Sequence, residues 1–303
     1  MAVGSWIGVD VGGSKLLAVK LGPDGAVEAT ATAVMPGRTA PGAELEDAVV
    51  RVASVVADGG AVAGLGVAVA GLVDAAAERF LFGAHLPWRD EPIRERLARR
   101  TGWTVAMDND ANCAARAEVA RGAARGAGSA LVITLGTGIG GAVVIDGRVI
   151  RGAHGLAGEF GHQQVVPDGL ACECGLRGCW EQYSSGRALE RVTRVALGRH
   201  LDGPEVTRLA REGDVVAQQA FATIGTWLGV GVAGLVSSFD PEIVVVGGGV
   251  SAVGDLLFAP ARAALAASLQ GTAYRPVPPL LAAELGPEAG AIGAALLVSQ
   301  GSV

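Results

Sequence analysis

Residues 6–21 read WIGVDVGGSKLLAVKL, and residues 130–145 read ALVITLGTGIGGAVVI. Each stretch consists of an apolar run typical of a β-strand, a glycine turn, and a second apolar run. The same strand–turn–strand unit therefore occurs twice, and duplication of an α/β unit explains this economically. Strand and helix patterns are mixed along the whole chain, which predicts an α/β architecture.

The segments around these two units predict further strands and helices. Apolar spacing, turn residues and capping residues locate their ends. Strands are expected at 27–33, 65–69, 104–107 and 243–246, and helices at 41–58, 91–100, 111–120, within 185–238, and at 289–298. Asp146-Gly147 is a hairpin turn signal. No low-complexity linker interrupts the chain, so we expect any domain boundary to be a hinge near Asn109.

The composition excludes several classes of protein. The chain has 303 residues, of which 50% are apolar and 18% charged, with a net charge of −6. It is too apolar for a disordered protein, and too acidic for a general nucleic-acid binder. Residues 94–100 are rich in arginine but are interleaved with glutamates, which favours a solvated helix face with a Glu95–Arg99 pair.

Neither a targeting signal nor a membrane span is predicted. The N-terminus lacks a basic segment and a long apolar core. Two long uncharged windows, 126–145 and 215–239, contain glycines, threonines, serines or glutamines and are interpreted as buried core. The four cysteines, three of them clustered, suit a reducing compartment. We therefore expect a cytoplasmic protein with no membrane partner.

Three glycine-rich turns follow apolar strands. Glycine lets backbone N–H groups approach a phosphate closely, although each turn alone could be a plain turn. The Gly136–Gly141 turn matches G-x-G-x-x-G, but a β-branched strand follows it where a dinucleotide-binding turn needs a helix. GVDVGGSK likewise lacks the spacing of a P-loop. Because the chain is acidic, binding of a nucleoside triphosphate would need local amides, Lys15 and a divalent cation. The turns are Gly12-Gly13-Ser14-Lys15, Gly136-Thr137-Gly138-Ile139-Gly140-Gly141 and Gly247-Gly248-Gly249.

A histidine and three cysteines form a candidate metal site. His162, Cys172, Cys174 and Cys179 offer four ligands, enough for a closed tetrahedral zinc site. A site with four protein ligands leaves no open position, so the zinc would be structural. A disulfide is the alternative.

Several acidic residues are candidates for catalysis or binding. Asp110 is either the N-cap of the helix that follows it or a general base, and both can be true. Glu159 and Glu181 are either surface acids or acceptors for sugar hydroxyl groups beside the zinc loop. Asp10, near the end of the first strand, could position a magnesium-bound water.

Taken together, these motifs resemble those of the ROK family of sugar kinases, and within it the ATP-dependent glucokinases. The matching stretches are GVDVGGSK, AGLVD, DNDANCAARAE, ITLGTGIGG, GEFGHQQVVPDGLACECGLRGCWEQYSSGRAL, VVGGGVS and LGPEAGAIGAA. They extend from residue 8 to 295, and the cysteine segment is the most specific of them.

The resemblance implies the actin-like ATPase (ribonuclease H-like) fold, in which two α/β domains surround a cleft. The smaller domain would comprise 1–109 and the C-terminal helix 289–303, and the larger one 110–288 with the zinc loop. The implied reaction is ATP-dependent phosphorylation of a hexose, most readily glucose to glucose 6-phosphate, in a dimer or tetramer. The alternatives are a kinase for N-acetylglucosamine, mannose or fructose, and a non-catalytic sugar-sensing regulator.

The resemblance also implies the roles of individual residues. Asp110 would be the catalytic base, and His162 would use one ring nitrogen for zinc and the other for sugar. Mg²⁺ would accompany ATP. Sugar hydroxyl groups would contact Asn109, Glu159, His162 and Glu181. ATP would contact Asp10, Gly12, Gly13, Ser14, Lys15, Gly136, Thr137, Gly138, Gly140, Gly247 and Gly248.

Four positions depart from the usual family pattern. Ser14 stands where threonine is usual, Asp108 where glutamate is common, Ala70 where many members have proline, and His85 where asparagine is frequent. The sugar-sensing repressors of the family carry an added N-terminal DNA-binding segment. Here the first glycine-turn motif begins at residue 8, which leaves no room for one, so we expect a kinase.

Overall fold

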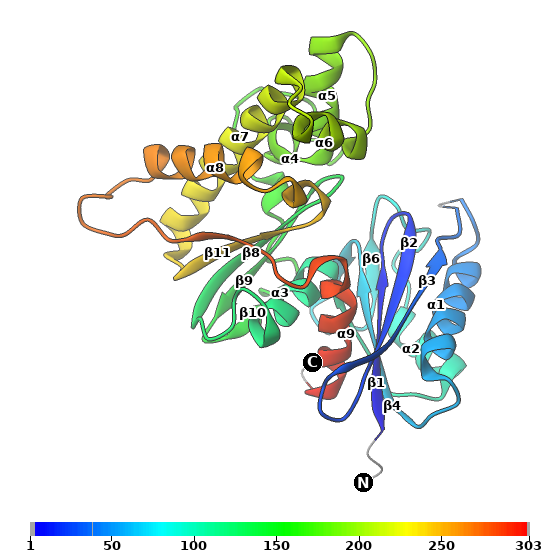
Figure 1. The fold of residues 1–303 in the computed structure, drawn as a ribbon. Coiled ribbons are helices and arrows are strands. Elements are labelled where there is room, and N and C mark those ends of the chain that lie inside the picture. Colours follow the sequence, from blue (N-terminus) through cyan, green and yellow to red (C-terminus); the bar gives the residue numbers. More distant parts are fainter. Residues whose placement is uncertain (1–3, 38, 302–303) are drawn as a thin grey trace. The chain divides into compact units, whose positions relative to one another are not determined.

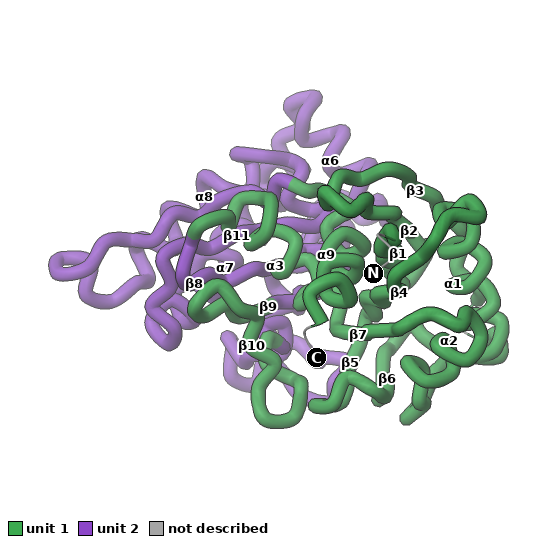
Figure 2. Tube along the Cα trace, turned by 90° about the horizontal axis from the view of Figure 1, so that it is seen from below, with its two compact units in different colours: residues 1–126, 142–158, 285–303 green, residues 127–141, 159–284 purple. Residues whose placement is uncertain are grey.

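The chain folds into two compact units in a computed structural model that describes residues 4–37 and 39–301 (Figures 1 and 2). Unit 1 comprises residues 1–126, 142–158 and 285–303. Unit 2 comprises residues 127–141 and 159–284. Both Asn109 and Asp110 therefore lie inside unit 1, and the C-terminal helix belongs to the same unit as the N-terminal strands.

Unit 1 is built on a five-stranded sheet with the order β3-β2-β1-β4-β7. The first two pairs are antiparallel, whereas β1, β4 and β7 are parallel. Their register aligns Val11 with Val69 and Val69 with Asn109, so these three strands end at one edge. The elements are β1 (Ser5–Val11), β2 (Lys15–Leu21), β3 (Val27–Val34), α1 (Gly42–Ala57), β4 (Val62–Val69), β5 (Leu72–Val73), β6 (Phe80–Phe82), α2 (Ile93–Thr101), β7 (Val105–Asn109), α3 (Asp110–Arg121), β10 (Arg148–Ile150) and α9 (Ala289–Ser299).

The two faces of this sheet bury different residues because side chains alternate along a strand. Ile7 and Val9 of β1 lie in one core cluster together with the apolar face of α1. On the other face, β1 and β4 present Gly8 and Gly66 to α9. A β-carbon at Gly8 would lie 1.8 Å from the carbonyl oxygen of Ala291, and one at Gly66 would lie 1.7 Å from that of Ala294. These glycines therefore allow the backbone of α9 to rest directly on the sheet.

Unit 2 carries most of the second sheet, which has the order β10-β9-β8-β11-β12. Here β8, β11 and β12 are parallel. The division between the units falls within β9 (Ile139–Ile145), which forms an antiparallel hairpin with β10. The remaining elements are β8 (Ser129–Leu135), the 3₁₀-helix η1 (Phe160–His162), α4 (Glu181–Ser184), α5 (Gly186–Leu197), α6 (Gly203–Arg211), α7 (Val215–Phe239), β11 (Ile243–Gly247), the 3₁₀-helix η2 (Gly249–Val253), α8 (Asp255–Ser268), β12 (Leu280–Ala282) and, in unit 1, the 3₁₀-helix η3 (Gly286–Glu288).

Helix α7 is the second of the long uncharged windows. By length and composition alone it could cross a membrane, with a mean hydropathy of 1.6, but 61% of that apolar stretch is buried inside the structure. Gly225 and Gly229 on α7 let α8 approach, since β-carbons there would meet the carbonyl oxygens of Leu257 and Ala261. The expected burial of this window is therefore confirmed for most of its length.

Most predicted elements are present with small shifts at their ends, but some were missed. Asp146 and Gly147 form the expected hairpin turn with φ angles of 51° and 69°, which suits a type I′ turn. Glu95 and Arg99 form the expected pair on α2. The sequence analysis did not predict α8, which contains Pro260, or the short strands β5, β6 and β12.

Candidate active site and metal centre

The carboxyl edge of the unit 1 sheet brings together a glycine turn and two aspartates. The turn Gly12–Ser14 joins β1 to β2, and the Gly12 N–H donates to the Lys15 carbonyl oxygen across it at 3.2 Å. Asp10 precedes this turn on β1, and Asp110 follows β7 directly. Since β1 and β7 end at the same edge, the topology places this acidic pair next to the first predicted phosphate turn.

Asn109, not Asp110, is the N-cap of α3, which corrects the capping interpretation of Asp110. The Asn109 Oδ1 atom accepts hydrogen bonds from the N–H groups of Ala111 and Asn112 at 2.8 and 3.2 Å. The Asn109 Nδ2 group donates to the Gly71 carbonyl oxygen at 3.1 Å. Asp110 is the first residue of the helix, and its Oδ1 also accepts from the Ala111 N–H. The cap shifts by one residue because Asn109 has the extended ψ of 147° that capping requires.

Electrostatics confirm that Asp10 and Asp110 influence each other. The pKa of Asp10 is raised to about 7, mainly by burial and then by the charge of Asp110, against the opposing charge of Lys15. Two carboxylates that share a low-dielectric site disfavour each other's charge. Asp10 is therefore only partly ionised near neutral pH.

The predicted metal ligands converge within unit 2. The ligand atoms of His162, Cys172, Cys174 and Cys179 all lie within 4.8 Å of one another. His162 Nδ1 is 3.7 Å from Cys172 Sγ, and Cys174 Sγ is 3.6 Å from Cys179 Sγ. A tetrahedral zinc ion with bonds of about 2.0–2.3 Å separates its ligands by about 3.3–3.8 Å, so the four residues fit this ion. The cysteines are free thiols, which rules out the disulfide alternative here.

Glu159 and Glu181 both lie beside this cluster rather than on an unrelated surface. The Glu181 Oε1 atom is 3.2 Å from Cys172 Sγ. Burial raises the pKa of Glu159, the charge of Glu181 adds to this effect, and His162 opposes it. A β-carbon at Gly138 would lie 2.5 Å from Glu181 Oε2, so the second glycine turn also borders this carboxylate.

Each of the two glutamates has a large buried aromatic residue as its neighbour in the chain. Phe160, next to Glu159, packs on Gly141, where a β-carbon would lie 2.1 Å from the ring. Trp180, next to Glu181, is fully buried, and its Nε1 group donates to the Trp227 carbonyl oxygen of α7 at 2.8 Å. The segment that carries the four metal ligands is thus packed into unit 2 at both ends by an aromatic residue next to each glutamate.

Unit 2 also contains a cavity of about 740 Å³ beside the second glycine turn. The Gly186 N–H at the start of α5 donates to the Gly136 carbonyl oxygen at 2.8 Å, so the turn and this helix N-terminus meet there. Amides at a helix N-terminus favour anions. The cavity is lined by Gly136, Thr137, Gly186, Arg187, Leu189, Glu190, Gly203, Pro204, Thr207, Arg208, Arg211, Glu212, Gly249, Val250 and Ala252.

A model of the ROK family matches residues 6–301. The chain therefore belongs to the ROK family. It is 38% identical to a glucokinase of Streptomyces coelicolor over 98% of both chains. It is also similar to the crystal structure of a ROK family glucokinase from Streptomyces griseus in complex with glucose and AMPPNP. That likeness has a TM-score of 0.90, with 39% identity, and covers 98% of this chain and 100% of the other.

ROK proteins include regulators as well as kinases. A xylose repressor of Bacillus subtilis is 31% identical to this chain, but the match covers 60% of this chain and 47% of the repressor. The two glucokinases match along nearly their full length. The expected actin-like ATPase fold and the ROK resemblance are both confirmed.

Some of the residues that border these sites were not predicted from the sequence. The cavity of about 740 Å³ is lined by Gly249 of the third predicted glycine turn, whereas Gly247 and Gly248, which the resemblance assigned to ATP, are not among its lining residues. Gly248 instead packs against the end of β8, where a β-carbon would lie 2.4 Å from the Leu135 carbonyl oxygen. Arg208 and Arg211 of α6 line the cavity, but an amphipathic charged helix gives no local signal that separates a cavity wall from a solvated face.

Proposed function

We propose that this ROK protein is a hexokinase-type kinase that transfers the γ-phosphoryl group of ATP to the 6-hydroxyl group of glucose. The full-length similarity to glucokinases supports the reaction class. The observation that carries the proposal within this chain is the four-ligand cluster flanked by Glu159 and Glu181. A rigid loop of this kind offers carboxylates and an imidazole to several sugar hydroxyl groups at once.

In the proposed reaction, Asp110 accepts the proton of the sugar 6-hydroxyl group. The new bond joins that oxygen to the γ-phosphorus, the bond from the γ-phosphorus to the β–γ bridging oxygen breaks, and ADP leaves. Phosphoryl transfer passes through a loose transition state, so alignment and charge stabilisation contribute more than strong basicity. A carboxylate is a sufficient base when the proton leaves late.

The remaining site residues would bind and orient the two substrates. Asn109 of unit 1 and Glu159, His162 and Glu181 of unit 2 would hold the sugar hydroxyl groups. The glycine turns at Gly12–Lys15 and Gly136–Gly140 would bind phosphates, and the cavity beside Gly249 would take the nucleoside. Magnesium bound with ATP would neutralise developing phosphate charge.

Zinc would be held by His162, Cys172, Cys174 and Cys179 and would serve as a structural crosslink of the sugar-binding loop. His162 contributes Nδ1 to the cluster, which leaves Nε2 able to contact a sugar hydroxyl group. We further propose a cytoplasmic homo-oligomer, a dimer or tetramer, whose mass light scattering would measure directly.

The test is a coupled ADP-release assay with glucose, mannose, N-acetylglucosamine and fructose. We expect turnover with glucose at a kcat/KM above that for each other sugar. Faster turnover with another hexose would correct the substrate, and polyphosphate offered in place of ATP would test the donor. Sugar binding without ADP release would instead identify a sensing regulator, the alternative that the repressor similarity supports.

A further inference from the structure

An ion pair with a buried carboxylate immediately precedes the proposed sugar-binding residue Asn109 in the chain. Asp108, the residue before Asn109, is 2% exposed, and its partner Arg151 is 20% exposed. The Arg151 Nε group donates to Asp108 Oδ1 at 3.1 Å. Removing one member of such a pair leaves a buried charge without compensation, which is costly.

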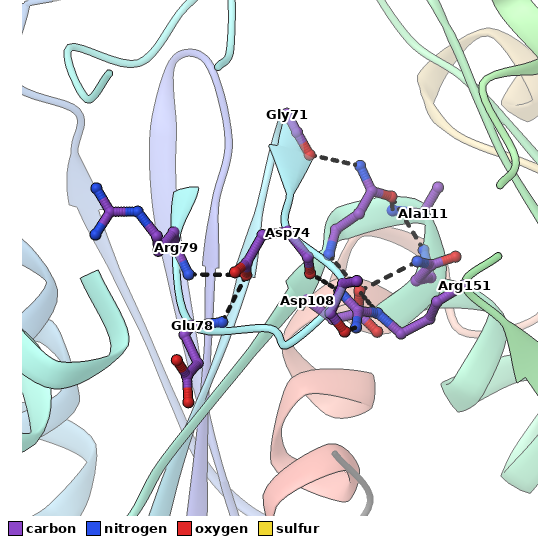
Figure 3. A network of polar contacts seen from close by, with 10 residues as sticks. Gly71, Asp74, Glu78, Arg79, Asp108, Ala111 and Arg151 are labelled. Carbon is purple, nitrogen blue, oxygen red and sulfur yellow. Dashed lines mark hydrogen bonds and ion pairs between the residues drawn. The ribbon is translucent and has the colours of Figure 1, made fainter. Parts of the chain in front are cut away.

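Arg151 divides its donors among separate segments instead of forming a two-bond pair with Asp108. Its Nη1 and Nη2 groups donate to the carbonyl oxygens of Ala75 and Asp74 at 2.7 and 2.8 Å. Figure 3 shows these contacts, with dashed lines from Arg151 to Asp108 and to the loop that carries Asp74. Asp108 Oδ2 is buried without a hydrogen-bond partner, so the guanidinium bridges two segments at the expense of full pairing.

The acceptor side of the network leads to Asn109 and Asp110. Asp108 Oδ1 also accepts from the Asn109 N–H at 2.8 Å and from the Asn112 Nδ2 group at 3.1 Å. Asn109 Nδ2 in turn donates to the Gly71 carbonyl oxygen, at the start of the same loop that Arg151 holds. Asp110 therefore lies in a backbone that is fixed immediately before and after it.

The loop is closed by its own hydrogen bonds and packs closely against the segment that follows Arg151. Asp74 Oδ1 accepts from the N–H groups of Glu78 and Arg79 at 2.8 and 2.9 Å, which closes the loop on itself. A β-carbon at Gly155 would lie 2.6 Å from the Val73 carbonyl oxygen, so the chain after Arg151 rests on the loop backbone. Arg151 thus joins two segments that are both already held in place.

We propose that Arg151 is a positioning residue that fixes Asn109 and Asp110 through Asp108 and the Gly71–Ala75 loop. This inference rests on the proposed roles of Asn109 and Asp110 in sugar binding and proton transfer. Arg151 need not touch a substrate, because it acts on the backbone that carries them. Lysine cannot replace it, since one ammonium group cannot serve three acceptors in a fixed planar arrangement.

The test compares R151K and D108N with the wild type and with R148A. Arg148 lies on β10, three residues before Arg151, and is exposed, so R148A removes a nearby arginine without touching the network. We expect kcat with glucose to fall about 10- to 100-fold in R151K and in D108N, because small displacements of a reacting group cost this much. R148A should stay within twofold of the wild type.

Two readouts separate positioning from simple loss of folded protein. The assays are run below the Tm of each variant, and AMPPNP-binding stoichiometry counts the folded fraction. We expect the KM for ATP to be unchanged, since the nucleotide cavity is built from other residues. We also expect the double variant D108N/R151K to be about as active as the less active of the two single variants, because both changes break one network.

The proposal is overturned if either single variant, counted as folded, keeps kcat within threefold of the wild type, or if the two losses multiply in the double variant. Should R151K not fold, D108N decides alone. If the wild-type protein phosphorylates none of the sugars, the proposed function is refuted. If the wild type is active and the variants keep its kcat, only the role of Arg151 is refuted.

Discussion

At the scale of single residues, local electrostatics determine which carboxyl groups are ready to react. Asp10 and Asp110 share the carboxyl edge of one sheet, and burial together with the Asp110 charge raises the pKa of Asp10 to about 7. Asn109, and not Asp110, caps α3, because its side chain accepts hydrogen bonds from the first N–H groups of the helix. Asp110 is therefore the first residue of the helix rather than its N-cap.

The raised pKa of Asp10 predicts how stability changes with pH. The folded state keeps the Asp10 proton between about pH 4 and pH 7, whereas the unfolded state releases it, so the free energy of unfolding falls as pH rises through this window. We expect Asp10→Asn to remove this part of the pH dependence, as measured by urea unfolding at intervals from pH 4 to pH 8. Asp58→Asn, at an exposed residue, is the matched control. Parallel curves for D10N and wild type would contradict the assignment.

Local sequence revealed the residue types of the site but not all of their neighbours. The candidate metal site could be predicted from the segment His162–Cys179 alone, because a histidine and three cysteines in one short loop rarely serve another role. The ion pair of Asp108 with Arg151, by contrast, joins positions far apart in the sequence, and nothing in either local stretch indicates the other. Likewise, nothing in the local sequence around Arg208 and Arg211 indicates that they line the cavity beside Gly136.

At the scale of elements, close backbone contacts at glycines position one helix on a sheet and another on a neighbouring helix. Helix α9 rests on Gly8 and Gly66, and α8 rests on Gly225 and Gly229 of α7. Apolar runs bounded by turn residues predicted the five strands of the main sheet in unit 1, but not the short strands β5 and β6. Helix α8 was missed since Pro260 argues against a helix in local sequence, although the packing on α7 sustains it.

Gly66→Ala should strongly destabilise unit 1. Its β-carbon would lie 1.7 Å from the Ala294 carbonyl oxygen, and a backbone atom of a helix cannot move aside as a side chain tip can. We expect a loss of about 3 kcal/mol or more in the free energy of unfolding, at the upper end of overpacking costs. Gly37→Ala is the control, since a β-carbon there meets no atom within 4 Å. An unchanged urea midpoint in G66A would show that α9 does not rest on the sheet as described.

The metal loop is the second element whose geometry can be tested separately. Cys174→Ser removes one of four ligands, and metal binding of about 10–16 kcal/mol in zinc peptides is comparable to the whole stability of a domain. We expect the zinc content to fall from one ion per chain and glucose binding to weaken at least tenfold. Elemental analysis and calorimetry measure these quantities.

Cys113→Ala provides the control for the zinc measurement. Cys113 is fully buried in unit 1 and is not one of the four clustered ligands, and burial raises the pKa of its thiol. C113A should therefore retain the metal. Purified wild-type protein without zinc, or C174S with one zinc ion per chain, would contradict the proposal that these four residues bind zinc.

At the scale of the whole molecule, the proposed reaction draws on both units. Unit 1 supplies Asn109 and Asp110 and the first glycine turn, and unit 2 supplies the metal loop and the cavity beside Gly136. The similarity to glucokinases spans nearly the entire chain, as a reaction that uses residues from every third of the sequence requires. Each unit has its own core, so damage to one site need not unfold the other.

The most direct measurement is the rate of ADP release by Asp110→Asn with glucose and ATP, alongside glucose binding by calorimetry. The substitution keeps the size of the side chain and removes the proposed proton acceptor, and Asp58→Asn serves as the control. We expect D110N to bind glucose within about threefold of the wild type while its kcat falls by about 10³-fold or more, toward the upper part of the range for general-base removal. A kcat within tenfold of the wild type would contradict the central claim that Asp110 takes the proton in phosphoryl transfer.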